Sequence, residues 1–171
     1  MSNIRWVYYP NNKTVNNKLL ETINIFEKNE ELITSQIDRD KGLESNDVLK
    51  ILSADLSEIG YEVEIDKKHK IPIPVLYGEN GKPEKWFDVD AYESNEGIII
   101  EVEAGRAVCN NQVIKDFFEA CMIDEAQYLI IAVRNNYRNS DDFKTVKKWF
   151  DSFYTCSNIT IPFKGLLIIG Y

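Results

Sequence analysis

Residues 86–105 read WFDVDAYESNEGIIIEVEAG, and they are the part of the chain that is most informative about its fold. Apolar and polar residues alternate at both ends of this stretch, which is typical of two strands, and the ESNEG between them is rich in turn-forming residues. Side chains on a strand alternate between its two faces. Asp88 therefore shares a face with Asp90, and Glu101 shares a face with Glu103.

The length of the turn decides whether these two acidic faces meet. With an even number of loop residues, Asp90 lies opposite Glu101 and Asp88 lies opposite Glu103. An odd number would shift the register by one residue and turn the acids to opposite faces. The apolar alternation favours the even number, because it then places both apolar sets on one face of the hairpin.

Carboxylates that lie opposite one another on a hairpin would be stabilised by a bound cation. With Cβ atoms ~5 Å apart they repel one another, so the fold does not gain from them unless something neutralises their charge. Mg²⁺ takes hard oxygen ligands, usually one or two carboxylates with several waters. We therefore expect a divalent-metal site on this hairpin, and the alternative is an acidic strand face that water solvates.

The flanking sequence predicts helices that alternate with strands. Continuous apolar runs near the C-terminus indicate strands buried on both faces. We expect an extended start at 6–9, helices at 15–36, 44–59, 110–122 and 141–153, and strands at 61–65, 86–92, 98–103, 128–133 and 165–169. This order predicts a single α/β domain with a mixed central sheet, in which 1–40 form an extended start and helical arm and 41–171 form the core.

Composition excludes several other kinds of site. The chain has 171 residues, one histidine, three widely spaced cysteines and a net charge of −8. A His-rich zinc site, a CxxC zinc ribbon and a disulfide framework are therefore excluded. The negative charge argues against attraction of nucleic acid or anionic lipid to the whole surface. With no membrane-length apolar run and no signal peptide, we expect a cytoplasmic protein that does not bind membranes.

The acids of the hairpin and the element order over 42–171 resemble the PD-(D/E)xK nuclease superfamily, which has the restriction-endonuclease-like fold. In that pattern an acid near the end of one strand is followed, after a turn, by an apolar strand that ends in (D/E)-x-K. Asp90 and Glu101-Val102-Glu103 match these positions. Glu103 stands where the family usually has lysine, which makes the motif an ExE variant, and Lys115 on the next predicted helix is the nearest lysine to replace it.

The resemblance implies a metal-dependent endonuclease that hydrolyses DNA with Mg²⁺ or Mn²⁺. The residues that hold the metal would be those of the motif with two further acids: Asp90, Glu101, the carbonyl of Val102, Glu44 and Asp88. The residues that act in catalysis would be Asp90, Glu101, Glu103 and Lys115. Glu103 would either accept a proton from the attacking water or bind a second ion.

Contacts to DNA phosphates need cations, and basic residues occur in several predicted loops. Some family members also place a glutamine at the start of the helix after the motif, where this chain has Gln112. The expected DNA contacts are Lys67, Lys68, Lys70, Arg106, Gln112, Arg134 and Arg138. A homodimer with two symmetric sites would be able to cut both strands.

Two other functions remain open. The first is a catalytically inactive nuclease-fold protein that acts as an interaction or regulatory module, which the missing lysine and the acidic charge favour. The second is an enzyme that acts on RNA or on another phosphate compound. The chain carries neither a nucleotide-binding glycine loop nor an aromatic RNA-binding motif, so the sequence supports this second possibility less.

Overall fold

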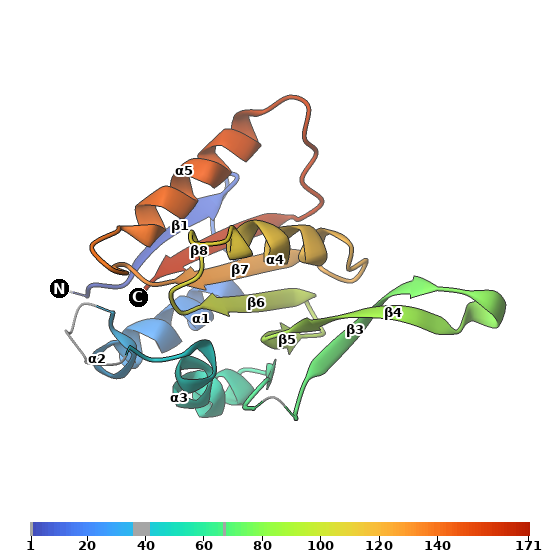
Figure 1. Ribbon diagram of the computed structural model, residues 1–171, viewed down its shortest axis with the longest axis horizontal. Helices are drawn as coiled ribbons and strands as arrows, with labels where there is room; N and C mark the ends of the chain where they lie inside the picture. The colour runs from blue at the N-terminus through green and yellow to red at the C-terminus, as the bar shows by residue number, and fades with distance from the viewer. Residues whose placement is uncertain (1, 36–41, 67) are drawn as a thin grey trace.

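A computed structural model describes residues 2–35, 42–66 and 68–171 (Figure 1). Within these residues the chain forms a six-stranded mixed sheet with helices on both faces, which confirms the predicted mixed α/β architecture. The strands lie in the order β1-β8-β7-β6-β5-β2. Their bounds are Arg5–Tyr9 (β1), Glu62–Val63 (β2), Ala91–Glu93 (β5), Ile98–Glu103 (β6), Tyr128–Val133 (β7) and Gly165–Gly170 (β8).

The centre of the sheet is parallel and its edges are antiparallel. β6 pairs with β7, and β7 pairs with β8, in parallel. Every residue of β8 is buried, and so are the last five of β7, which confirms that these apolar runs are strands covered on both faces. Parallel strands require crossover connections, and the helices between them supply these connections.

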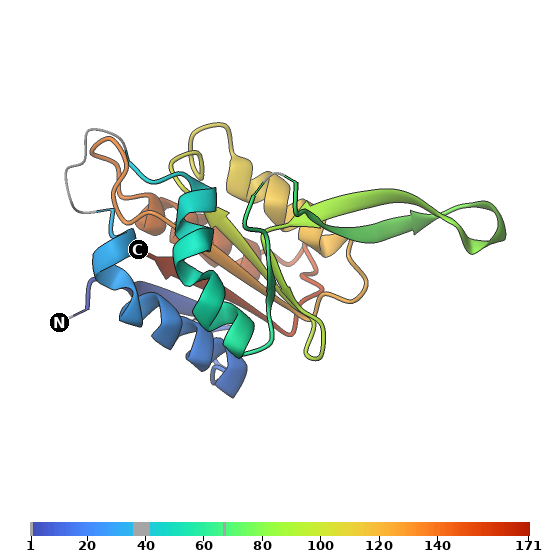
Figure 2. The same ribbon diagram turned by 90° about the horizontal axis from the view of Figure 1, so that it is seen from below.

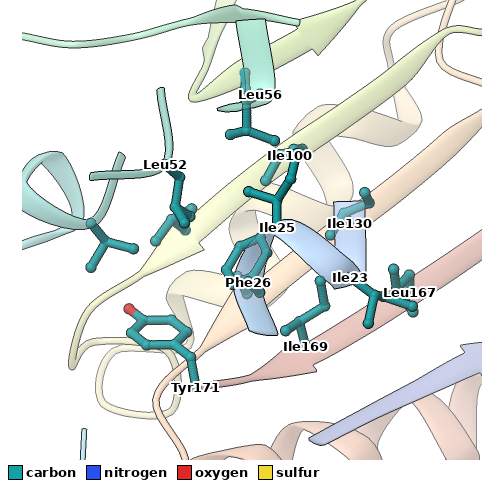
Figure 3. Close-up of a cluster of buried hydrophobic side chains, with 14 of the residues drawn as sticks. Ile23, Ile25, Phe26, Leu52, Leu56, Ile100, Ile130, Leu167, Ile169 and Tyr171 are labelled. Atoms are coloured by element: carbon teal, nitrogen blue, oxygen red, sulfur yellow. The ribbon is translucent and has the colours of Figure 1, made fainter. Parts of the chain in front are cut away.

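Two apolar cores lie on opposite faces of the sheet. Helices α1 (Asn17–Lys28), α2 (Glu30–Ile33) and α3 (Ser45–Glu58) pack on one face, where side chains such as Phe26 and Leu56 meet Ile100 (Figure 3). Helices α4 (Gln112–Cys121) and α5 (Asp142–Thr155) pack on the other face, above the sheet in Figure 1, whereas the view from below in Figure 2 has α1 and α3 in front. No helix among the described residues is long and apolar enough to cross a membrane.

The N-terminal segment is built into the same sheet. β1 pairs with β8 along the edge, with Arg5 opposite Gly170. The helix predicted at 15–36 is two helices, because Asn29 ends the first one: its side-chain amide donates to the carbonyl of Ile25 and to Asp55. Asparagine commonly breaks helices in this way, since its side chain competes for backbone hydrogen bonds.

The strand predicted at 86–92 is also divided. β4 (Pro83–Val89) pairs with β3 (Ile71–Tyr77) in a separate two-stranded hairpin, and the short 3₁₀ turn Glu79–Gly81 lies at its tip. Figures 1 and 2 show this hairpin extending beyond the sheet. The chain bends at Asp90, and β5 then pairs with β6.

The predicted register of the second hairpin is confirmed where pairing exists. Ala91 lies opposite Ile100, and the turn consists of 94–97. The predicted pair of Asp88 with Glu103 is wrong, because Asp88 lies in β4 and pairs with Pro72 instead. The bend at Asp90 stops the pairing before it reaches that point.

Candidate functional site

A cleft of about 510 Å³ opens where the last residues of β6 meet the bend at Asp90, the first turns of α4 and the base of the β3–β4 hairpin. Carboxylates and ammonium groups line most of it. The charged residues of its wall are Asp88, Asp90, Glu101, Glu103, Asp116, Glu119, Lys70, Lys85 and Lys115. The cleft therefore contains both the donor groups for a cation and the cations to balance a phosphate.

Asp90 is fixed to β6 by its side chain. Its Oδ2 accepts a hydrogen bond from the backbone N–H of Val102 at 2.7 Å. Its carbonyl accepts from the N–H of Glu64 at 2.8 Å, so the bend is tied to the strands on both sides. Burial raises the pKa of Asp90 to about 7, the Val102 N–H opposes this rise, and the nearby carboxyl of Glu64 adds to it.

Glu101 and Glu103 lie on one face of β6, as the alternation predicts, and both line the cleft. Burial holds the pKa of Glu101 well above its usual range, and the charge of Asp90 adds to this effect. Burial also raises the pKa of Glu103, to about 9, together with a hydrogen bond to the carboxyl of Asp116. Burial therefore favours the protonated form of both acids, and a bound cation would favour the ionised form.

Helix α4 supplies a polar row to the opposite wall. Gln112 Nε2 donates to Asp116 Oδ1 at 2.9 Å. Lys115 Nζ lies 3.5 Å from the same oxygen and 2.9 Å from Glu119 Oε2. Asp116 is only 6% exposed, so it is a buried carboxylate held between an amide, an ammonium group and Glu103.

Sequence reasoning missed Asp116 and Glu119, which line the cleft, and Glu64, whose backbone bonds to Asp90. Asp116 belongs to the α4 face that also carries Val113, Phe117 and Ala120, and a charged residue on an otherwise apolar helix face was the available signal. Glu64 is buried and pairs with Lys70 at 2.9 Å. The alternation at 61–65 predicts a water-facing Glu64, but β2 contains only residues 62 and 63 and Glu64 turns inward.

Most of the predicted catalytic and metal-binding residues come together in the cleft. Asp88, Asp90, Glu101, Val102, Glu103 and Lys115 all line it. Glu44 does not line it: it caps α3, where its side chain accepts the N–H of Asp47 and its own N–H donates to Asp47 Oδ2 at 3.0 Å. Its neighbour Ser45 does line the cleft, and Ser45 Oγ accepts from Ala104 N–H at 3.2 Å.

The predicted DNA contacts are divided. Lys70 and Gln112 line the cleft. Lys68 and Arg106 are exposed outside its wall. Arg134 donates to the carbonyl of Leu43, and both Arg134 and Arg138 lie over the ring of Tyr137, away from the cleft wall. Lys67 lies outside the described residues.

The donor chemistry of the cleft fits a hard cation. Carboxylate and carbonyl oxygens are the ligands that Mg²⁺ and Mn²⁺ prefer. Within the described residues, no group of three or more His, Cys, Asp or Glu side chains is placed to hold an ion by protein ligands alone. Mg²⁺ in proteins usually takes one or two carboxylates and keeps several waters.

No protein-family model matches this chain, and a search of curated proteins found no match.

Proposed function

We propose that this chain has the restriction-endonuclease-like fold and is a metal-dependent nuclease that hydrolyses DNA phosphodiester bonds. One observation carries the proposal: the Asp90 carboxylate bonds to the backbone N–H of Val102, which places the acid of the motif beside Glu101 and Glu103 in one cleft. Apart from the separate β3–β4 hairpin, the order α3, β2, β5, β6, α4, β7 supports it, since a helix, three strands, a helix and a strand is the core that the motif implies.

Asp90, Glu101 and the carbonyl of Val102 are the residues that would hold the metal. When bound there, Mg²⁺ or Mn²⁺ polarises a phosphate oxygen and lowers the pKa of a bound water. Asp90 and Glu101 are brought together in the cleft although burial raises the pKa of both, and the charge of Asp90 raises that of Glu101 further. A protein that keeps two such acids together is preorganised for a cation.

The remaining groups of the cleft handle protons and phosphate charge. Glu103 and Asp116 share a hydrogen bond and act as one carboxyl pair, to which we assign the acceptance of a proton from the attacking water. Lys115, held by Asp116 and Glu119, offers an ammonium group to the phosphate. Asp88 lies on the hairpin wall of the cleft, where it is an accessory acid.

Cleavage of DNA by the wild-type chain and by Glu101→Gln tests the proposal. Supercoiled, linear duplex and single-stranded DNA are each incubated with protein and Mg²⁺ or Mn²⁺, with RNA in parallel. We expect Glu101→Gln to cut more than about 100-fold more slowly, because even partners outside the ligand shell are worth 10- to 100-fold. Glu31→Gln, which changes an exposed glutamate of α2, is the matched control and should cut normally.

The outcomes separate the competing functions. Undiminished cleavage by Glu101→Gln contradicts the assigned site. If the chain cuts RNA but not DNA, its substrate is RNA. A wild-type chain that cuts no nucleic acid and binds neither metal by calorimetry is the interaction module rather than the enzyme.

A further inference from the structure

The β3–β4 hairpin carries an unusual amount of exposed apolar and aromatic surface. It extends beyond the body of the molecule in both views (Figures 1 and 2). Leu76 is 52% exposed, Tyr77 is 54% exposed and Trp86 is 47% exposed. A two-stranded hairpin is marginally stable by itself, and large exposed aromatic groups on it commonly mark a binding surface.

The outer edge of β3 is not built for strand addition. Pro72 and Pro74 occupy alternate positions of this strand and have no N–H to donate. The backbone hydrogen bonds to β4 must therefore come from the intervening residues Ile71 and Ile73. The backbone nitrogens of the two prolines are then on the outer edge of β3. Prolines placed in this way block a sheet edge, which argues against a second copy or a peptide that pairs along β3.

The base of the hairpin forms one wall of the acidic cleft. Lys85, Trp86 and Phe87 of β4 line the same cleft as Asp90 and Glu101. Lys85 Nζ lies 4.9 Å from the centre of the Phe87 ring, and within the described chain it has no carboxylate partner. The exposed aromatic surface is thus continuous with the site proposed for phosphodiester cleavage, and a cation able to meet a phosphate lies beside it.

The charge of the molecule decides how a nucleic acid would bind there. Binding to duplex DNA depends largely on cations that neutralise many phosphates, and a chain with net charge −8 supplies few of them. Stacking of bases on aromatic side chains adds an attraction that does not itself depend on charge, and it needs bases that are not already paired. An acidic protein with an exposed tryptophan in its cleft is therefore better suited to unpaired nucleotides.

The size of the cleft agrees with this. A volume of about 510 Å³ lies in the range of sites that take one small ligand. It has room for a nucleotide or two of one strand.

We propose that the base of the β3–β4 hairpin is a stacking platform for unpaired nucleotides, so that the substrate is DNA with a single-stranded segment, such as an overhang or a flap. Trp86 stacks on a base, Lys85 meets the adjacent phosphate, and the strand then passes Asp90 and Glu101. This inference rests on the proposed function, because it takes DNA as the substrate of the same cleft.

Tryptophan fluorescence tests the inference without cleavage. The chain has three tryptophans, of which Trp6 on β1 is 43% exposed and so matches Trp86. Trp6→Phe and Trp86→Phe are titrated with a short single-stranded oligonucleotide, with Ca²⁺ in place of Mg²⁺. We expect quenching in Trp6→Phe, which retains Trp86, and little quenching in Trp86→Phe.

Affinity gives a second readout. We expect Trp86→Ala to bind the oligonucleotide about 5- to 100-fold more weakly, as for loss of one stacked base, and Trp86→Phe to recover much of this loss. Trp6→Ala should bind as the wild type does. The same sequence as a blunt duplex should bind more weakly than the single strand, and thermal melting should show that all variants are folded.

Equal quenching in both variants, or preference for the duplex, overturns the inference. Fluorescence of Trp86 that changes with protein concentration before DNA is added also overturns it, because a second copy then covers the hairpin. If the wild-type chain cuts DNA and Trp86→Ala binds and cuts it equally well, the nuclease proposal stands and the stacking platform is refuted. If single strands quench the fluorescence of Trp86 but no condition gives cleavage, the stacking platform stands and the nuclease proposal is refuted.

Discussion

Asp90 is the residue on which the site depends most. Its carboxylate takes the place of a main-chain acceptor for the Val102 N–H, so the ladder between β5 and β6 ends there and the chain is free to turn into the projecting hairpin. The same side chain lies in the cleft beside Glu101. One residue therefore shapes the backbone and contributes a carboxylate to the cleft.

Asp90→Asn should lose function and gain stability. An amide keeps an oxygen that can accept from Val102 but carries no charge. Burial raises the pKa of Asp90 to about 7, so at pH 8 its ionised form destabilises the folded state. We expect the free energy of unfolding of the variant at pH 8 to exceed that of the wild type by about 1–3 kcal/mol. Its melting temperature at pH 8 should be higher for the same reason. Its Mg²⁺ binding by calorimetry should be lost.

The increase in stability caused by Asp90→Asn should become smaller as the pH falls. Near pH 4 the folded protein already holds a proton on Asp90, so the substitution then removes no charge from it. A variant that is less stable than the wild type at pH 8, measured in metal-free buffer, would contradict this account of Asp90.

The sequence predicts part of the site at the level of single residues. Strand alternation alone places Glu101 and Glu103 together, and the motif adds Asp90. Asp116 could not be foreseen as their partner, since its contact with Glu103 depends on how α4 packs over the sheet. Glu44 was assigned to the site from its place at the start of a helix, but the local capping box determines where its side chain goes.

At the level of elements, the hairpins show why the sequence predicts strands better than their partners. The residues at 86–89 and 91–92 are all extended, as their alternation indicates. A period of two cannot reveal that the first group pairs with β3 and the second with β6. The alternate prolines of β3 leave one edge of this strand able to pair, and that edge meets β4.

The prolines of β3 should keep the molecule from associating. Pro72→Val with Pro74→Val restores two outward N–H groups beside an apolar surface, which makes an adhesive strand edge. We expect the double variant to form dimers or larger species by size-exclusion chromatography with light scattering. Pro162→Val, in an exposed loop outside the hairpin, is the control. Unchanged association behaviour in the double variant would show that the edge is protected in another way.

At the scale of the whole molecule, the acidic cleft makes stability depend on pH and metal. The pKa values of Asp90, Glu101, Glu103 and Asp116 are all raised, chiefly by burial. For an acid with a raised pKa, stability is fully present below the unfolded value and is lost as the pH rises through the folded value. The window therefore runs from about pH 4, the unfolded value, to about pH 9.

We expect the melting temperature in EDTA to fall as the pH rises through this window, and Mg²⁺ to restore it most strongly at the alkaline end. At a concentration 100 times its Kd, a ligand stabilises by about 2.7 kcal/mol, or roughly 5–10 °C for a chain of this size. Glu101→Gln should show a smaller response to Mg²⁺. A melting temperature that does not respond to Mg²⁺ at any pH would contradict a metal site in the cleft.

The overall architecture was the most predictable level. Apolar periodicity identifies the central strands β6, β7 and β8 and the helices α3, α4 and α5 that cover them. The place of β1 could not be predicted in the same way. Its pairing with β8 joins residues far apart in the chain, and no local pattern encodes such a contact.

The position of β8 also bears on synthesis of the protein in the cell. β8 lies between β1 and β7, yet it leaves the ribosome after every other described element. Until then β1 has no neighbour in the sheet, and both apolar cores lack one of their central strands. Such distant pairing closes late in folding. The nascent chain therefore cannot complete its cleft on a finished scaffold until β8 has been made.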